Sequence, residues 1–336
     1  MNVLVTGGAG YIGSHTSKAL AQAGFVPIVY DNLSAGHEWS VQWGPLVVGD
    51  INNRALLIRT IRKYEIEAVC HLAAHAYVGE SVTNPRKYYQ NNLVGSLTLL
   101  DAMVDSGVRR LVFSSTCATY GAPRTLPIDE THSQAPVNPY GETKLAIERA
   151  LRWYGEAFGL EWAVLRYFNA AGADPDGEIG EQHDPESHLI PLAIEAAITQ
   201  ATPIAIFGID YPTPDGTAIR DYIHVTDLAR GHVCALSYLE HGGESNSFNL
   251  GLGAGHSVRE IISSVGRVTG RRISVLECRR RAGDPAVLVA CAARARATLG
   301  WCPQLLSLDE IVNTAWQWRG SRGGALGHPR PLQVSR

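Results

Sequence analysis

The sequence predicts an α/β protein built on a doubly wound parallel sheet, with a smaller mixed α/β domain after it. Short β-branched runs alternate with longer helical patterns through the first half of the chain. A glycine-rich turn separates the first run from the first helix, and the alternation stops after residue 169. Because parallel strands need crossover connections, which are usually helices, this alternation indicates a parallel sheet covered by helices.

The elements of the first half follow one another in a regular order. Apolar and β-branched runs predict strands over 2–6, 25–31, 45–50, 68–73, 109–116 and 161–169. Helical patterns predict helices over 12–23, 53–64 and 84–106, and a further helix that begins at Pro139. Each helix then links two parallel strands through a right-handed crossover.

The second half has longer loops and more widely spaced elements. Loops rich in glycine, proline and acidic residues are predicted over 170–188 and 209–221. Between and after them we expect helices over 189–200, 225–240, 257–269 and 307–318, and strands over 204–208, 247–251 and 271–277. Residues 1–169 should form one domain, to which parts of 222–250 return, and 170–320 a second domain. The last residues, 321–336, are expected to be a mobile tail.

Composition and charge exclude several classes of function. The chain has 336 residues and a formal net charge of −3, so no overall basic field attracts nucleic acid or an anionic membrane. No apolar run reaches the roughly 18–20 residues that span a bilayer, and the N-terminal MNVLVTGG lacks the pattern of a signal peptide. The six cysteines show no C-x-x-C spacing, and the twelve histidines no H-E-x-x-H. We therefore expect free thiols in a reducing cytoplasm and no metal site.

The stretch TGGAGYIGSHT joins the first strand to the first helix, and its Gly7, Gly10 and Gly13 are spaced G-x-x-G-x-x-G. Such glycines permit a tight turn and let a pyrophosphate approach the helix N-terminus. Asp31, which ends the second strand, can accept hydrogen bonds from both hydroxyls of an adenosine ribose and would repel a 2′-phosphate. Together they favour NAD over NADP, with Asp50 as a further candidate beside the adenine. The alternative is a glycine turn with a solvated aspartate.

In VNPYGETKL, residues 137–145, Tyr140 and Lys144 lie one helical turn apart on a helix that Asn138 can cap. Taken alone, this spacing also fits an ordinary amphipathic helix. Thr116, however, ends the predicted fifth strand, and such sheets bind ligands at the carboxyl ends of their strands. A phenol with a pKa of about 10 is a poor base, and lowering that pKa to about 7 requires roughly 4 kcal/mol. An ammonium and a positive nicotinamide ring can supply this stabilisation, while the threonine hydroxyl orients the reacting group.

Seven stretches between Val3 and about Trp318 resemble the extended short-chain dehydrogenase/reductase family: TGGAGYIGSHT, DNLSAG, YVGES, SSTCATYG, NPYGETK, RYFNAAGADP and DGTAIRDYIHV. Within that family they are most similar to the nucleotide-sugar 4-epimerases. The resemblance implies a Rossmann-type domain that holds NAD and a second domain that binds a UDP-sugar. It also implies a cytoplasmic homodimer, formed through the helices over 84–106 and 139–159.

The reaction that the resemblance implies is epimerisation of UDP-glucose or UDP-galactose at C4, a step of galactose metabolism. Tyr140 would remove the proton of the 4-hydroxyl, and the sugar would pass through a transient 4-keto state. Lys144 would stabilise the phenolate and contact the nicotinamide ribose. The family's hydroxyl residue is matched by Thr116, with Ser115 as the alternative.

The resemblance also implies two sets of binding residues. Those that would bind the cofactor are Gly7, Gly10, Tyr11, Ile12, Gly13, Asp31, Asn32, Asp50, Ile51, Leu72, Ala73, Ala74, Asn92, Ser114, Tyr140, Lys144 and Tyr167. Those that would bind the substrate are Thr116, Tyr140, Asn169, His188, Leu189, Arg220, Arg281 and Asp284. For Asn92 a role in helix packing is the alternative, and Arg279 and Arg280 are expected to be solvated charges.

The sequence departs from the family pattern at three positions. Ala76 stands where some members have a lysine that contacts phosphate or NAD. His188 replaces a common asparagine beside the nucleotide, and a plain loop histidine is the alternative. Leu288 occupies the position that controls access of bulky 2-acetamido sugars.

Other functions share parts of this pattern. A pentose enzyme that interconverts UDP-xylose and UDP-arabinose has the same motifs and stays open, as does another nucleotide-sugar epimerase. A 4,6-dehydratase needs carboxylates after the hydroxyl residue, where this chain has Cys117 and Ala118. A non-catalytic NAD-sensing protein often lacks the tyrosine or the lysine, and both are present here.

Overall fold

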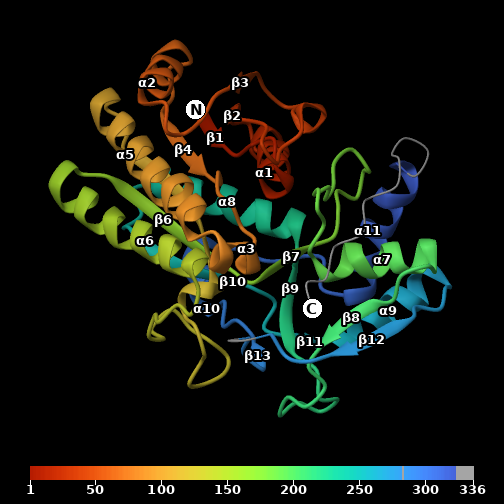
Figure 1. The fold of residues 1–336 in the computed structure, drawn as a ribbon. Coiled ribbons are helices and arrows are strands. Elements are labelled where there is room, and N and C mark those ends of the chain that lie inside the picture. Colours follow the sequence, from red (N-terminus) through yellow and green to blue (C-terminus); the bar gives the residue numbers. More distant parts are fainter. Residues whose placement is uncertain (282–283, 323–336) are drawn as a thin grey trace.

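The computed structural model describes residues 1–281 and 284–322 of the chain. A large sheet between two helical layers forms one part, and short strands with α7 (Leu189–Thr199), α9 (Val258–Thr269) and α11 (Leu308–Arg322) form the other (Figure 1). The tail expected over 321–336 lies outside the described residues, except for 321 and 322, which continue α11.

The large sheet confirms the predicted doubly wound parallel architecture. In the described part of the chain it has seven strands in the order β10-β6-β5-β4-β1-β2-β3, and neighbouring strands are parallel. Their bounds are β1 (Asn2–Thr6), β2 (Val26–Asp31), β3 (Leu46–Val48), β4 (Ala68–His71), β5 (Arg110–Thr116), β6 (Glu161–Tyr167) and β10 (Asn246–Leu250). β10 therefore returns to this sheet from a distant part of the sequence.

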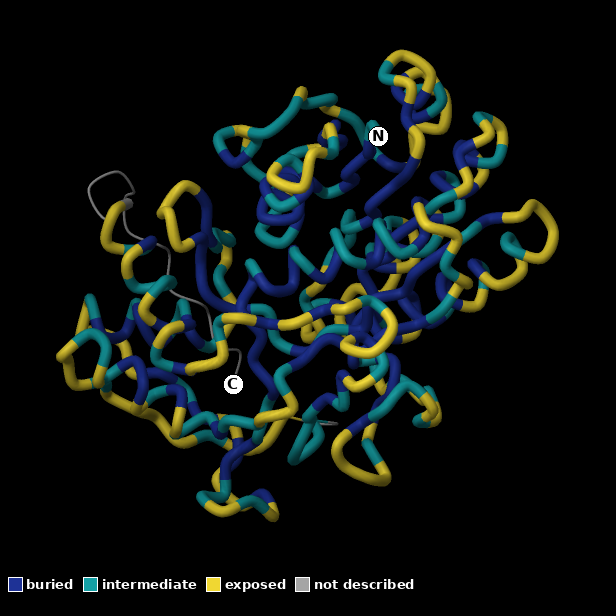
Figure 2. The backbone as a smooth tube through the Cα atoms, turned by 180° about the vertical axis from the view of Figure 1, so that it is seen from behind, coloured by how far each residue is buried: buried dark blue, intermediate teal, exposed yellow. Residues whose placement is uncertain are grey.

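Helices cover both faces of the sheet, because successive strand residues point to opposite sides. Phe113 packs with α2 (Arg54–Lys63), α5 (Gly95–Ser106) and α6 (Pro139–Phe158) in one core. Its neighbour Val112 packs with α1 (Tyr11–Gln22) and α8 (Val225–Glu240) in a second core, which α10 (Ala293–Leu299) extends. Figure 2 shows the result as buried backbone inside and exposed loops outside.

The helix predicted over 84–106 is continuous in outline but not uniform. It begins as α4 (Pro85–Tyr88), widens to a π-helical segment over Tyr89–Val94 and continues as α5. A short helix, α3 (Val78–Thr83), precedes it. The wider turn carries Asn92, whose side-chain amide reaches across to both backbone groups of His75. Wide turns of this kind often occur near functional sites.

The smaller part contains two further sheets. One has β9 (Ile219–His224) paired with β11 (Gly255–Ser257), β13 (Val287–Leu288) and β7 (Asn169–Ala171), and the other pairs β8 (Ile204–Phe207) with β12 (Val275–Cys278). The loop predicted over 209–221 is therefore wrong at its end, since β9 begins at Ile219. Its charged residues Arg220 and Asp221 obscured the strand pattern. Asp221 is buried because its carboxylate accepts three backbone N–H groups.

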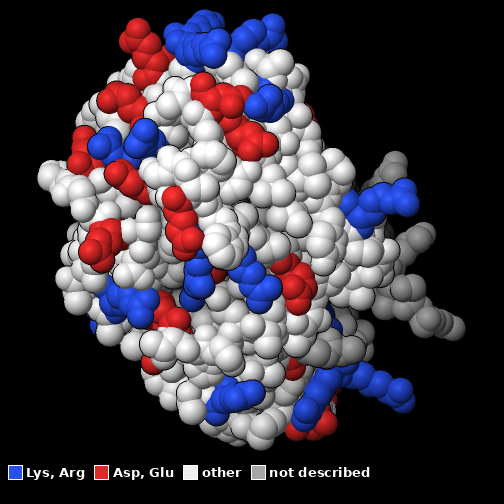
Figure 3. Space-filling view, turned by 90° about the vertical axis from the view of Figure 1, so that its left-hand side faces the viewer, with Lys and Arg blue, Asp and Glu red and all other residues white. Residues whose placement is uncertain are grey.

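The lengths of the helices and the charges of the surface complete the description of the fold. No helix among the described residues is long and apolar enough to cross a bilayer. Basic and acidic side chains are interspersed on the face in Figure 3, in keeping with a net charge of −3. Short 3-10 turns at Glu38–Ser40 and Cys117–Thr119 complete the regular structure.

Candidate active site

The glycine turn lies at the point where the order of the large sheet reverses. β1 has β2 on one side and β4 on the other, and ligands of such sheets bind outside the strand ends at this switch point. A Cβ on Gly7 would lie 2.6 Å from the backbone nitrogen of Ala73, and Gly7 has a positive φ of 74°. A Cβ on Gly13 would lie 2.0 Å from the carbonyl oxygen of Gly7. Only glycine fits these two positions.

Asp31 lies at the carboxyl end of β2, as the sequence predicts, and is 8% exposed. One carboxylate oxygen accepts the backbone N–H of Ala9 at 3.0 Å and the other that of Leu33 at 2.8 Å. Burial raises the pKa of Asp31, and these two hydrogen bonds oppose the shift. A carboxylate offers about four acceptor sites, so about two remain for the hydroxyls of a ribose.

The other adenine-side candidates also gather here. The side-chain amide of Asn32 donates to Asp50 at 3.0 Å, and the N–H of Asn52 donates to the same carboxylate at 2.8 Å. Burial alone would raise the pKa of Asp50, but these hydrogen bonds outweigh it and the pKa is lowered. Ile51 beside it is buried. A polar rim over an apolar floor suits a purine.

The loop after β4 carries Leu72, Ala73 and Ala74, and the backbone of Ala73 touches the glycine turn. Asn92 is 1% exposed, and its amide holds this loop through His75 rather than facing outward. The geometry therefore favours a supporting role for Asn92. Tyr11 and Ile12 open α1, and the Tyr11 hydroxyl donates to the carbonyl of Gly172 at 2.6 Å.

Tyr140 lies in the first turn of α6, which begins and is capped as the sequence predicts. The side chain of Asn138 caps the helix by accepting the N–H of Gly141 at 2.8 Å, and Pro139 occupies the first turn. Tyr140 is 8% exposed, and its ring meets that of Tyr88 edge to face. Burial raises the pKa of Tyr140 well above its ordinary value, and a hydrogen bond from Thr116 partly opposes that shift.

Lys144 lies one turn further along α6 and is 3% exposed. Its Nζ donates to the carbonyl oxygen of Ser114 at 2.8 Å and stands 4.9 Å from the centre of the Phe113 ring. Burial lowers the pKa of Lys144 to about 7, against a smaller opposite effect of Glu148. An ammonium held in this way is poised to interact with an anion.

Of the two hydroxyls at the end of β5, Thr116 faces the tyrosine. Ser115 is fully buried and donates to Glu148 at 2.5 Å, so its hydroxyl is already engaged. Thr116 is 7% exposed, and its side chain lies close enough to Tyr140 to oppose the raised pKa of that phenol. The geometry therefore favours Thr116 over the alternative Ser115 as the partner of Tyr140.

Two buried networks behind the site were not predicted from the sequence. Arg166 forms an ion pair with Glu148 at 2.6 Å, and both side chains are only 3% exposed. On the other face of β5, Ser114 donates to Nε2 of His232 at 2.6 Å, because Nδ1 of His232 already donates to a carbonyl. Burial lowers the pKa of His232 to about 4, so it is neutral at pH 7. Burial raises the pKa of Tyr167 to about 12, and the nearby Ser114 side chain partly opposes this shift.

The predicted substrate residues lie in the smaller part of the molecule. Arg220 pairs with Asp284 at 2.5 Å across two segments that are far apart in the sequence. Arg281 stacks on Phe207 at 4.1 Å instead of joining that pair. Asn169 begins β7, and Leu189 begins α7.

His188 precedes α7 and is partly exposed. Its Nδ1 lies 2.5 Å from Glu181 and 3.4 Å from Glu186. Burial lowers the pKa of His188, but the two carboxylates outweigh it and raise the pKa to about 10. A protonated His188 would add positive charge at the N-terminus of α7. His188 is thus paired with carboxylates of its own loop, and its role as a substrate contact stays a prediction.

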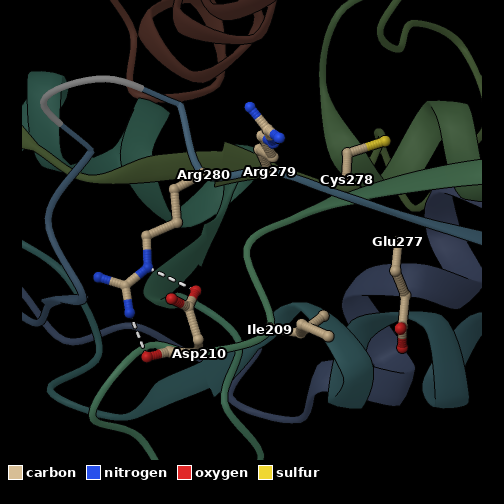
Figure 4. A pocket seen from close by; sticks show the side chains of 6 residues that line it. All are labelled: Ile209, Asp210, Glu277, Cys278, Arg279 and Arg280. Carbon is tan, nitrogen blue, oxygen red and sulfur yellow. Dashed lines mark hydrogen bonds and ion pairs between the residues drawn. The ribbon is translucent and has the colours of Figure 1, made fainter.

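A hollow of about 680 Å³ lies beside the carboxyl ends of the paired strands β8 and β12, and it is lined by Ile209, Asp210, Glu277, Cys278, Arg279 and Arg280 (Figure 4). Arg280 is not simply solvated, since it pairs with Asp210 at 2.7 Å and stacks on Tyr211 at 4.2 Å. In Figure 4 the side chain of Arg279 points away from that pair. The hollow contains none of the hydroxyl, phenol or ammonium groups of the site described above.

Comparisons with known proteins identify the family to which the chain is similar. The profile of the NAD dependent epimerase/dehydratase family matches residues 3–251. UDP-glucose 4-epimerase of Rhizobium meliloti (strain 1021) is 52% identical over 321 residues, which are 96% of this chain and 98% of that protein. A structure of UDP-glucose 4-epimerase from Brucella ovis in complex with NAD is 54% identical, with a TM-score of 0.92 over 94% of this chain and 97% of that one. A Stenotrophomonas maltophila UDP-glucose-4-epimerase, with bound NAD and formylated UDP-arabinopyranose, is 40% identical, with a TM-score of 0.93 over 97% and 100%.

Proposed function

Because the chain belongs to the NAD dependent epimerase/dehydratase family, we propose that it interconverts UDP-glucose and UDP-galactose at C4. The observation that carries this proposal is the identity of about half of all residues with UDP-glucose 4-epimerases over nearly the full length. The arrangement of Thr116, Tyr140 and Lys144 adds independent support, since it provides the hydroxyl, phenol and ammonium that the reaction needs.

The residues at the switch point fit NAD. The absence of side chains at Gly7, Gly10 and Gly13 leaves room for a pyrophosphate at the N-terminus of α1. Asp31 has acceptor sites left for the adenosine ribose, and its charge disfavours a 2′-phosphate. The chemistry that NAD supplies when bound is the removal and the return of a hydride at C4 of the sugar.

Tyr140 acts as the base that takes the proton of the 4-hydroxyl and later returns it to the other epimer. In the chain alone, burial holds its pKa too high for this role. The Lys144 ammonium would lower that pKa, since opposite charges favour the phenolate, and the positive ring of a bound nicotinamide would add to this effect. Thr116 orients the sugar hydroxyl toward the phenolate.

The UDP moiety is held from the smaller part of the molecule. Arg220 and Arg281 bind the pyrophosphate, because a planar guanidinium pairs with two phosphate oxygens at once. Asp284 accepts a ribose hydroxyl, and its pairing with Arg220 orients both side chains. Asn169, His188 and Leu189 complete the substrate contacts. The remaining cofactor contacts are Tyr11, Ile12, Asn32, Asp50, Ile51, Leu72, Ala73, Ala74, Ser114 and Tyr167, and Asn92 supports the loop that carries three of them.

A pentose substrate is the second candidate. The observation in its favour is the formylated UDP-arabinopyranose bound to the Stenotrophomonas relative. A separate question is whether the site admits 2-acetamido sugars. Leu288 lies opposite Arg220 in the pairing of β13 with β9, so it borders the proposed substrate site. A leucine there leaves more room for a 2-acetamido group than a tyrosine would.

Product analysis tests the choice of sugar. UDP-glucose, UDP-xylose, UDP-glucuronate and UDP-N-acetylglucosamine are incubated in parallel and their products separated by chromatography. We expect UDP-galactose as the main product. Faster turnover of UDP-xylose would favour the pentose function and reject the first proposal.

Replacing Tyr140 by phenylalanine tests the mechanism. We expect Tyr140→Phe to bind NAD and UDP-glucose but to turn over about 10²–10⁴ times more slowly, because the base is lost. Turnover close to that of the natural protein would reject Tyr140 as the base.

The cofactor content of the purified protein tests whether NAD is held tightly. A denatured extract of the natural protein that contains no dinucleotide would count against a tightly held cofactor.

We also propose a cytoplasmic homodimer. Four large apolar side chains on the helical face formed by the π-helical segment and α6 are at least two-fifths exposed: Tyr89, Val94, Trp153 and Phe158. Such a face is typical of an interface. All six cysteines are unpaired thiols, which supports a reducing compartment. Light scattering should give a mass of twice the 36.3 kDa of one chain. Trp153→Glu should shift the measured mass toward that of a single chain. A monomeric natural protein would refute the dimer.

A further inference from the structure

Four side chains of the loop between β7 and α7 converge on one point. Glu181, His183, Glu186 and His188 each offer one ligand atom, and all these atoms lie within 4.8 Å of one another. We call them the His₂Glu₂ cluster. Their spacing, E-x-H-x-x-E-x-H, differs from the C-x-x-C and H-E-x-x-H patterns of zinc sites, so the sequence pattern alone does not predict the cluster.

Three of the distances within the cluster match those between the ligand atoms of a tetrahedral metal site. Ligand atoms about 2.0–2.2 Å from a zinc ion lie about 3.3–3.6 Å from one another at the corners of a tetrahedron. Nδ1 of His183 is 3.3 Å from a carboxylate oxygen of Glu181 and 3.5 Å from one of Glu186. Nδ1 of His188 is 3.4 Å from the other oxygen of Glu186. The remaining contact, His188 to Glu181 at 2.5 Å, is a hydrogen bond that a metal ion would replace.

One nitrogen of the cluster is buried without a hydrogen bond. Nδ1 of His183 lies within ion-pair distance of both carboxylates, yet neither contact has the alignment of a hydrogen bond and the atom finds no other partner among the described residues. Buried polar atoms are rarely left so. A metal ion at the centre of the cluster would satisfy this atom and both carboxylates.

A neighbouring acidic group shows the contrast. Asp174, Asp176 and Glu178 also lie close together, but Nζ of Lys18 is within 2.8 Å of all three. In the described part of the chain, neither Glu181 nor Glu186 is paired with a lysine or arginine. The side chain of Glu181 is only 6% exposed, so its charge needs compensation within the cluster.

The loop that carries the cluster is fixed before any metal binds. Three side chains from other parts of the fold donate hydrogen bonds to its backbone carbonyls. The bonds run from Trp318 to Glu181 at 3.2 Å, from His37 to Gln182 at 3.1 Å, and from Tyr77 to Pro185 at 2.9 Å. A site held in place by its surroundings loses little freedom when it binds an ion.

We propose that the His₂Glu₂ cluster binds one divalent transition-metal ion, for which two imidazoles and two carboxylates in a tetrahedron favour Zn²⁺. The ring of Tyr11, from the glycine turn, lies 6.3 Å from that of His183. The ion would therefore fix the loop that leads into α7 beside the cofactor turn. The cluster shares His188 with the proposed substrate contacts, but the ion takes no part in the proposed reaction at C4.

Metal binding by two substituted proteins tests the proposal. The full chain is stripped with a chelator, dialysed against Zn²⁺ and analysed for bound metal. We expect the natural protein to bind one equivalent more than either His183→Ala or Glu186→Gln. Asp184→Asn removes a carboxylate of the same loop outside the cluster, and it should bind as much as the natural protein. Equal binding by all four proteins would overturn the proposal.

Cobalt provides a second readout, because its visible spectrum distinguishes four-coordinate from six-coordinate sites. We expect Co²⁺ to give intense absorption with the natural protein and weak absorption with Glu186→Gln, which is nearly isosteric and should fold. Zn²⁺ should also raise the melting temperature of the natural protein but not that of Glu186→Gln. A weak spectrum that the substitution does not change would mean that protons on the two imidazoles, rather than a metal, hold the cluster together.

Discussion

Replacing Lys144 by methionine measures what a buried ammonium costs the protein when the cofactor is absent. Lys144 is 3% exposed, and its Nζ has one hydrogen bond, to the carbonyl of Ser114. Burial lowers its pKa from 10.5 to about 7. Below about pH 7, the folded protein must therefore hold a charge that the unfolded chain exposes to water. Methionine has a similar length and carries no charge.

The sign and size of the effect follow from this lowered pKa. Between about pH 7 and 10.5 the unfolded chain keeps the proton that the folded chain has released, so the stability of the natural protein rises with pH. The rise is about 1.4 kcal/mol per pH unit. At pH 7 the variant should thus be more stable by roughly 4 kcal/mol, less about 1 kcal/mol for the lost hydrogen bond. That advantage should shrink by roughly 2–3 kcal/mol at pH 9.

Urea unfolding of the NAD-free proteins at pH 7 and pH 9 provides the measurement. Tyr140→Phe is the matched control, because burial keeps the pKa of Tyr140 well above 10 and the phenol stays neutral at both values. Its effect on the free energy of unfolding should be the same at both. If Lys144→Met lowers stability equally at pH 7 and pH 9, the reasoning about a buried charge is refuted. A confirmed gain would show that the buried ammonium lowers the stability of the NAD-free protein.

Three further predictions follow from the packing around the site. Gly13→Ala should abolish NAD binding, measured as cofactor content, because its Cβ would lie 2.0 Å from a backbone oxygen of the turn. In contrast, a Cβ on Gly79 would have no atom within 4 Å, so Gly79→Ala should change the free energy of unfolding by less than about 1 kcal/mol. Glu148→Leu should cost about 3–5 kcal/mol in urea unfolding, because it leaves the Arg166 charge buried and unpaired, and the added change Arg166→Met should recover much of that loss. A double variant less stable than the single one would contradict this account. Thr116→Val should lower kcat about 10- to 100-fold while Thr116→Ser keeps most of it, and equal loss in both would argue against the hydroxyl.

The large sheet could be predicted from the sequence because its strands are buried on both faces. Such strands are continuous apolar runs, and the run over 2–6 has the bounds of β1. β9 was partly missed for the opposite reason. Arg220 and Asp221 interrupt its apolar pattern, and only contacts with distant residues such as Asp284 compensate their charges. A pattern read along the chain does not contain those contacts.

The candidate site divides in the same way. Tyr140, Lys144 and the glycine turn were predictable because helix periodicity and turn chemistry place them locally. The sequence alone does not decide whether Ser115 or Thr116 is the partner of Tyr140. The structure favours Thr116, because the hydroxyl of Ser115 donates a hydrogen bond to Glu148. The support from His232 is likewise invisible in the sequence, because it lies 118 residues from Ser114. Partners of this kind leave no local pattern.

The loop from Gly172 to Pro185 follows the first domain in sequence but is attached to it in space. It is joined to segments that flank the large sheet by contacts that include Tyr11 to Gly172, Lys18 to Asp174, His37 to Gln182 and Tyr77 to Pro185. His188 and Leu189 come directly after it, so the elements that hold the cofactor also set the position of these proposed substrate contacts. A substitution in this loop should therefore change the affinities for NAD and for the UDP-sugar together, whereas one at Arg220, whose partners lie in the smaller part, should change only the second.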